Sequence, residues 1–179
     1  MRAGKQNQVP TILQTYYNIR IVSYLVLHNK LGFGGKRIQN LERAVEKYLD
    51  DYDSERYPAG FFEQEMRAKG IDVTTVVQEI PQRVRMILTY GSRIPTRVSP
   101  KEMTAIRVTM QSFLAISMYA LNKDMRISVK KIKEIYLPYI AFNLECLAEK
   151  RRLQMKDIAL VIADECGYQD HRYADAKRA

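Results

Sequence analysis

Cysteine, histidine and long apolar runs are all scarce in this chain of 179 residues. Its two cysteines, Cys146 and Cys166, cannot build a disulfide framework, and with only two histidines they leave few ligands for a structural zinc site. The longest apolar stretches, Ile21–Leu27 and Phe113–Leu121, are far shorter than the roughly 20 residues of a membrane-spanning helix. Residues 1–8 lack the apolar segment of a secretory signal. We therefore expect a cytoplasmic protein that needs no membrane, metal or cofactor.

Side chains that could perform catalysis are few as well. His28 and His171 are the only imidazoles, the first near the end of a predicted helix and the second near the end of the chain. Nothing in the sequence activates the thiolate of Cys146 or Cys166, so both cysteines are expected to pack as small apolar side chains. We therefore expect a protein without enzymatic activity.

Apolar residues recur at three- and four-residue steps along almost the whole chain, as in Ile38, Leu41, Val45, Tyr48 and Tyr52. This spacing places them on one side of a helix, and no segment alternates with a period of two for long enough to predict a strand. The sequence therefore predicts an all-α protein, a bundle of about seven or eight helices. The expected helices cover residues 10–31, 35–52, 61–69, 73–88 in two pieces, 100–121, 128–147, 156–166 and 170–177.

The segment 91–99 is the best internal boundary, because its glycine, serine and proline residues predict a loop. Directly after it, Ser99, Pro100 and Glu102 have the spacing of a capping box at a helix start. We expect the parts on either side to pack either as one bundle or as two helical halves. The two parts are residues 1–91 and residues 92–179.

Positive charge dominates, with 29 Lys and Arg against 20 Asp and Glu, a net charge of +9 and a pI near 9.5. The segment Glu42–Glu65 holds eight acids and three bases, a net charge of −5, so the rest of the chain carries +14. Such a surface attracts polyanions over about one Debye length, roughly 8 Å at physiological salt. Nucleic acid or a nucleoprotein is the expected partner; the alternative is that the charge only keeps the protein in solution.

Bases gather in three stretches between residues 83 and 152. A loop and the helix starts beside it can bring such residues onto one surface that fits a phosphate backbone, whereas the alternative is a set of scattered, solvated charges. The predicted contacts are Arg83, Arg85, Arg93, Arg97, Lys101 and Arg107 in the first stretch, Lys130 and Lys133 in the second, and Arg151 and Arg152 in the third.

A glycine-rich string at residues 31–37 ends in Lys36 and Arg37. Its three glycines allow a close approach of the backbone, so the string either lets the start of a helix contact a phosphate or forms a tight turn that tucks Phe33 into the core. The spacing is not that of a Walker motif. Both interpretations place Lys36 and Arg37 at a helix start.

The acidic segment at the end of the second predicted helix matches only part of a calcium-binding EF-hand loop. Arg56 stands where the loop needs glycine, and Phe62 stands where it needs the final glutamate. A magnesium site with two carboxylates is one alternative, and a solvated acidic face that contacts a positively charged groove of a partner is the other. The residues of this predicted acidic partner surface are Asp50, Asp51, Asp53 and Glu55.

The tail has the pattern of a helix-turn-helix. A predicted helix at residues 156–166 is followed by Gly167 and a second predicted helix at residues 170–177. Ile158 and Ala159 match the apolar and small positions of such a motif. The side chains placed to meet base edges are Gln169, His171 and Arg172.

The string Leu-His-Asn-Lys-Leu-Gly-Phe-Gly-Gly-Lys-Arg at residues 27–37 resembles a Leu-His-x-Lys-x-Gly-Phe-Gly-x-Lys-Arg string of small prophage and mobile-element proteins of Gram-positive bacteria. The resemblance covers about the first 50 residues. It implies a phage or mobile-element origin and no reaction. Among accessory proteins of that origin and size, the chain looks most like a type II-A anti-CRISPR protein, an inhibitor of Cas9.

The expected function is therefore that of a non-enzymatic phage protein that inhibits a host nucleic-acid machine, with the Cas9–guide RNA complex as its partner. The alternative is a DNA-binding transcriptional regulator that uses the helix-turn-helix at residues 153–178. An enzymatic function is the third and least favoured interpretation.

Overall fold

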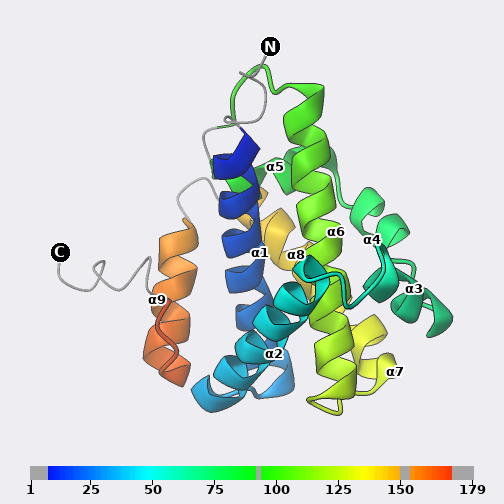
Figure 1. Cartoon of the computed structure of the whole chain (residues 1–179). Coiled ribbons are helices and arrows are strands. Elements are labelled where there is room, and N and C mark those ends of the chain that lie inside the picture. Colours follow the sequence, from blue (N-terminus) through cyan, green and yellow to red (C-terminus); the bar gives the residue numbers. More distant parts are fainter. Residues whose placement is uncertain (1–7, 92–93, 150–153, 171–179) are drawn as a thin grey trace.

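A computed structural model describes residues 8–91, 94–149 and 154–170, and every structural statement below concerns these residues (Figure 1). They form eight helical segments and no strand, which confirms the predicted all-α bundle. None of the described helices has the length and apolar composition needed to span a membrane. The elements are α1 (Gln8–Leu31), α2 (Gly35–Asp53), α3 (Phe61–Ala68), α4 (Val73–Glu79), α5 (Gln82–Tyr90), α6 (Pro100–Lys123), a continuous rod of α7 (Val129–Lys131), π-helical η1 (Ile132–Tyr136) and α8 (Leu137–Glu149), and α9 (Met155–Cys166).

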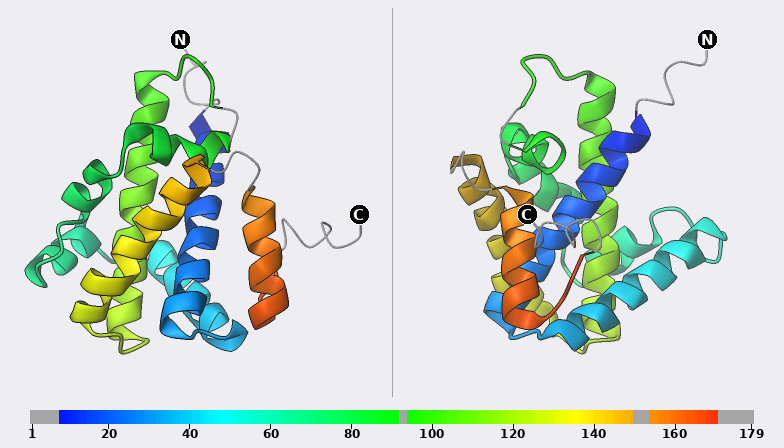
Figure 2. Two further views of the ribbon diagram at one scale, coloured as in Figure 1. Left: turned by 180° about the vertical axis from the view of Figure 1, so that it is seen from behind. Right: turned by 90° about the vertical axis from the view of Figure 1, so that its left-hand side faces the viewer.

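Helices α1 and α6 form the centre of the bundle and pack against each other. In Figure 1, α2 crosses in front of them, and the view from behind in Figure 2 shows α8 crossing on the opposite face. Every residue from Phe113 to Leu121 is buried, as is every residue from Asn18 to Tyr24. A helix buried on all sides needs neighbours all round, and α2, α3, α4, α5, α8 and α9 supply them.

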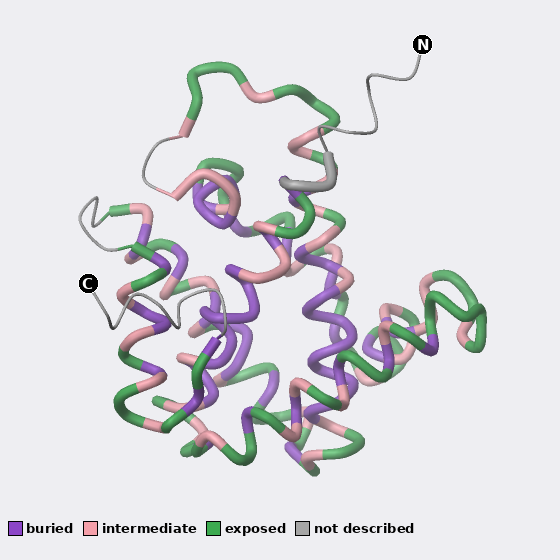
Figure 3. The backbone as a smooth tube through the Cα atoms, turned by 60° about the vertical axis from the view of Figure 1, so that its left-hand side comes forward, coloured by how far each residue is buried: buried purple, intermediate pink, exposed green. Residues whose placement is uncertain are grey.

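One cluster of buried side chains runs through the whole bundle (Figure 3). It includes Leu27 and Val45 from the first predicted half, and Leu114 and Ile140 from the second. The boundary predicted at residues 91–99 lies in the connection between α5 and α6. The helices on its two sides share this core.

Most helix ends fall where the turn residues predict them. At the start of α6, the Ser99 hydroxyl accepts a hydrogen bond from the Glu102 backbone N–H at 3.2 Å, and the Glu102 carboxylate accepts one from the Ser99 backbone N–H at 3.0 Å. This is the predicted capping box. The break before Pro81 separates α4 from α5, since proline cannot continue the hydrogen-bond ladder of a helix.

The rod from α7 to α8 contains a feature that the sequence analysis did not predict. This rod contains Pro138, and a π-helical stretch, Ile132–Tyr136, lies shortly before it. Proline lacks a backbone N–H, and its ring crowds the carbonyl of the preceding turn. A wider π-turn at that position relieves the crowding, and such turns occur often at functional sites.

Candidate polyanion-binding surface

Five of the predicted basic residues lie at one end of the bundle, where α5, the connection after it and the first turns of α6 meet (Figure 1). The hydroxyl of Tyr90 donates a hydrogen bond to the Glu102 carboxylate at 3.3 Å and so joins the end of α5 to the start of α6. We call this region the α5–α6 cationic end. Its described bases are Arg83, Arg85, Arg97, Lys101 and Arg107.

A cavity of about 270 Å³ opens between the two helices of the cationic end. Arg85 and Arg107, which are 22 positions apart in the sequence, both line it. The remaining lining residues are Gln82 and Met86 from α5, and Pro100, Met103, Thr104 and Ile106 from α6. The structure thus brings together two arginines that the sequence places on different helices.

None of the five bases forms an ion pair with a carboxylate of the described residues. Glu102 is the only acid between residues 83 and 107, and it is engaged by Ser99 and Tyr90. The hydrogen bonds from Ser99 lower the pKa of Glu102, so it stays ionised while it caps the helix. The positive charge of this end is therefore not neutralised locally.

Arg85 is half-buried, and its Nη1 donates to the backbone carbonyl of Val77 at 2.6 Å. Burial lowers the pKa of Arg85, and the nearby positive charge of Arg107 lowers it further. The two causes are distinct, loss of water and repulsion by a like charge, and no carboxylate among the described residues pairs with Arg85 to offset them.

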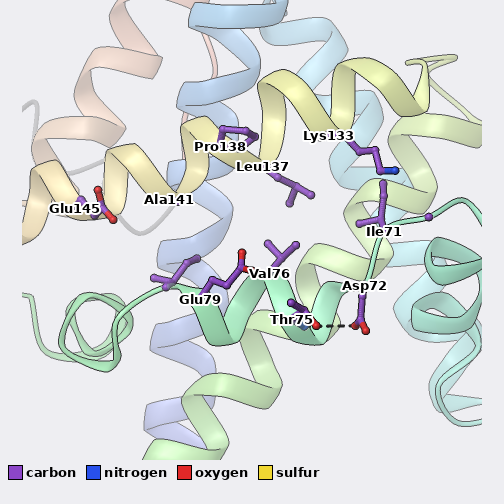
Figure 4. A pocket seen from close by; sticks show the side chains of 12 residues that line it. Ile71, Asp72, Thr75, Val76, Glu79, Lys133, Leu137, Pro138, Ala141 and Glu145 are labelled. Atoms are coloured by element: carbon purple, nitrogen blue, oxygen red, sulfur yellow. Dashed lines mark hydrogen bonds between the residues drawn. The ribbon is translucent and has the colours of Figure 1, made fainter.

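The second basic stretch does not join the cationic end. Lys130 and Lys133 follow the far end of α6, a helix of 24 residues and therefore about 36 Å long. Lys130 pairs with Glu134 at 4.0 Å. Lys133 lines a groove of about 430 Å³ whose other charged residues are all acidic (Figure 4). These acidic residues are Asp72, Glu79 and Glu145.

The glycine string forms the predicted tight turn, with Phe33 fully buried and Lys36 and Arg37 exposed. The Arg37 guanidinium stacks on the Phe33 ring, 3.9 Å from its centroid. A Cβ atom added at Gly35 would clash with the backbone carbonyl oxygen of Cys166. The start of α2 therefore packs against the carbonyl end of α9, and its two bases lie apart from the cationic end.

The acidic stretch is only partly an open face, which corrects the prediction for one residue. Asp51 is buried and accepts a hydrogen bond from Arg56 at 2.6 Å, so its charge is used within the chain. Asp50, Asp53 and Glu55 are exposed at and after the end of α2. In the described part of the chain, no group of three or more His, Cys, Asp or Glu side chains is arranged to hold a metal ion.

The tail has the first helix and the turn glycine of the predicted helix-turn-helix, and residues 171–177 of the predicted second helix lie outside the described residues. Helix α9 ends at Gly167 as expected, but residues 167–170 are not helical, and Tyr168 and Asp170 are buried. Asp170, predicted to begin a second helix, instead accepts a hydrogen bond from Arg20 of α1. Gln169 is exposed. The remaining predicted contacts, Arg93, Arg151, Arg152, His171 and Arg172, lie outside the described residues.

Sequence reasoning missed the buried charge cluster that holds this segment. Arg20 donates to Glu42 of α2 at 2.7 Å and to Asp170 at 2.6 Å, and the Tyr168 hydroxyl donates to Glu42 at 2.7 Å. We call these four residues the Arg20 cluster. A lone arginine within the apolar run Ile19–Val22 was the available signal, because a buried charge requires a partner.

The two nitrogens of the His28 ring both have partners. Nδ1 lies 2.9 Å from the Phe33 carbonyl oxygen and Nε2 lies 3.2 Å from the Glu165 carboxylate. Both partners are acceptors, so both hydrogen bonds form together only when the imidazole carries two protons. The ring connects the end of α1 to α9.

Fold and surface together define an all-α bundle with one cationic end. No protein family, curated protein or solved structure matches the chain.

Proposed function

We propose that this chain is a non-enzymatic binding protein of a phage or mobile element that acts on a nucleic-acid machine in the bacterial cytoplasm. The favoured target is the Cas9–guide RNA complex, and the α5–α6 cationic end makes the contact. One observation carries the proposal: five bases lie at this end, and none forms an ion pair within the described residues.

Phosphate groups of a guide RNA or of target DNA would supply the missing negative charge. Each phosphate contact releases counterions, so affinity depends steeply on salt. A protein bound to the phosphate backbone of the guide or its target blocks pairing between them without any chemical step. This fits a stoichiometric inhibitor.

The alternative, a DNA-binding regulator, is supported less well. Helix α9 and the left-handed Gly167 match the first helix and the turn of a helix-turn-helix. A recognition helix must stand clear of the body to enter a major groove. Tyr168 and Asp170, however, are buried against α1 and α2, directly after that turn.

The test is a pair of double variants with the same change in charge. R97E/K101E reverses two exposed bases of the cationic end, and R43E/K47E reverses two exposed bases on α2. Binding to a type II-A Cas9–guide complex and to duplex DNA is measured by fluorescence anisotropy over a salt series, together with target cleavage. We expect R97E/K101E to weaken binding and inhibition by about tenfold or more, and R43E/K47E by no more than about threefold.

Two results would contradict the proposal. Equal losses in the two double variants would mean that net charge alone attracts the partner. Absence of binding to both partners at low salt would remove the function altogether. Sequence-specific duplex binding that survives R97E/K101E would instead favour the regulator.

A further inference from the structure

Arg85 and Arg107 both line the cavity between α5 and α6, and both have hydrogen-bond donors that are not used among the described residues. A guanidinium carries five N–H donors. Arg85 uses Nη1 for the Val77 carbonyl, and Arg107 has no hydrogen-bond partner among the described residues. Both residues border a space of about 270 Å³.

The polar groups around the two arginines do not satisfy them. The Gln82 amide donates to the sulfur atoms of Met86 and Met103, which are weak acceptors, so it too lacks a strong partner. The Glu102 carboxylate is turned to Ser99 and Tyr90. Because the two guanidinium groups repel each other and Arg85 is partly desolvated, an anion placed between them would relieve both penalties.

The rest of the lining indicates what else the ligand carries. Met86, Met103 and Ile106 give the cavity an apolar wall beside the arginines. Methionine side chains are polarisable and adapt to flat or irregular groups such as a base. The volume is slightly below that of an ordinary small-molecule site, which fits a single nucleotide unit and excludes a whole helix or strand.

We propose that this cavity binds one phosphate group of a nucleic-acid strand, with the guanidinium groups of Arg85 and Arg107 on its oxygen atoms and the methionine wall against the adjoining sugar or base. Arginine is suited to this because its planar fork matches two phosphate oxygens at once. The inference rests on the proposed function and deepens it, because it replaces a general attraction with one built site.

The test uses a short fluorescein-labelled oligodeoxythymidine at low salt and near neutral pH. Its variants are R107Q, R107K and R85K, and the control is R43Q, an exposed arginine on α2 that undergoes the same loss of charge. We expect R107Q to lose about tenfold in affinity, because charged hydrogen bonds are lost. R107K and R85K lose less than R107Q but more than the control, because they keep the charge without the fork. R43Q changes affinity by no more than about twofold. Thermal unfolding of each variant checks that it is folded.

Each remaining outcome is decisive. If R107Q and R43Q weaken binding equally, the cavity is not a site, although the cationic end can still bind polyanions as proposed. If the unaltered protein binds neither nucleic acid nor the Cas9–guide complex, the proposed function fails, and inorganic pyrophosphate then tests the cavity alone. Amide chemical shifts on α5 and α6 that move with pyrophosphate and stay fixed in R107Q support the cavity, and unchanged shifts in the unaltered protein overturn it.

Discussion

The Arg20 cluster and the α5–α6 cationic end both contain arginine side chains, but in opposite surroundings. Arg20 is only 5% exposed in its side chain and touches two carboxylates. Arg85 and Arg107 are more exposed, share a cavity and touch none in the described residues. In the first region charge joins three parts of the chain, whereas in the second it is left available to an external anion.

The largest expected difference in the free energy of unfolding is between two arginine-to-glutamine variants, one in each region. R20Q removes a charged partner from the buried carboxylate of Asp170 and from the partly buried carboxylate of Glu42, and breaking a buried ion pair on one side costs about 3–5 kcal/mol. R107Q removes a partly exposed charge that repels Arg85, so the free energy of unfolding should change by less than about 0.5 kcal/mol. Urea denaturation measures both. Similar losses in the two variants would contradict the distinction.

A smaller effect is expected where the turn before α2 packs against the end of α9. G35A introduces a methyl group against the Cys166 carbonyl, and overpacking of this kind costs about 1–3 kcal/mol. G34A is the matched control, because its added Cβ would meet nothing within 4 Å and its φ is −82°. The control should lose less than about 1 kcal/mol. Thermal and urea unfolding compare the two, and a loss in G34A as large as that in G35A would mean that the close approach is unimportant.

The smallest effect concerns the acid that caps the cationic end. The pKa of Glu102 is lowered from its ordinary value of 4.5 when the chain folds. Its contribution to stability is therefore present above pH 4.5 and is lost as the pH falls through the folded pKa. The E102Q variant lacks this titration, so its melting temperature should fall less steeply with acid than that of the unaltered protein. If the melting temperatures of the two proteins fall in parallel as the pH is lowered below 4.5, the capping box contributes no pH dependence.

Much of the helix order could be predicted from short-range signals. Ser99 and Glu102, Pro81 and Gly167 each mark a boundary through the chemistry of a few neighbouring residues. The Arg20 cluster depends on a contact between residues 150 positions apart, and no local pattern encodes such a contact. The π-helical stretch likewise depends on how the folded chain relieves crowding around Pro138, and no local pattern in the sequence predicts it.

For the candidate surface, the sequence could predict which residues are basic, but not which other charged residues lie near each of them. Lys133 and Arg107 both belong to basic stretches of the sequence. Only folding places Lys133 in a groove whose other charged residues are the acids Asp72, Glu79 and Glu145, and Arg107 in a cavity that it shares with another arginine. Charge of one sign is visible in a sequence, whereas its compensation depends on tertiary contacts.

The position of Asp170 sets a limit for anyone who shortens this protein. A chain cut after Cys166 keeps every described helix intact, yet it loses Tyr168, which packs on the Tyr24 ring, and the closer of the two carboxylates that hold Arg20. Expression plasmids for crystallisation or fusion should therefore retain the sequence through Asp170, and a reporter domain belongs beyond that point.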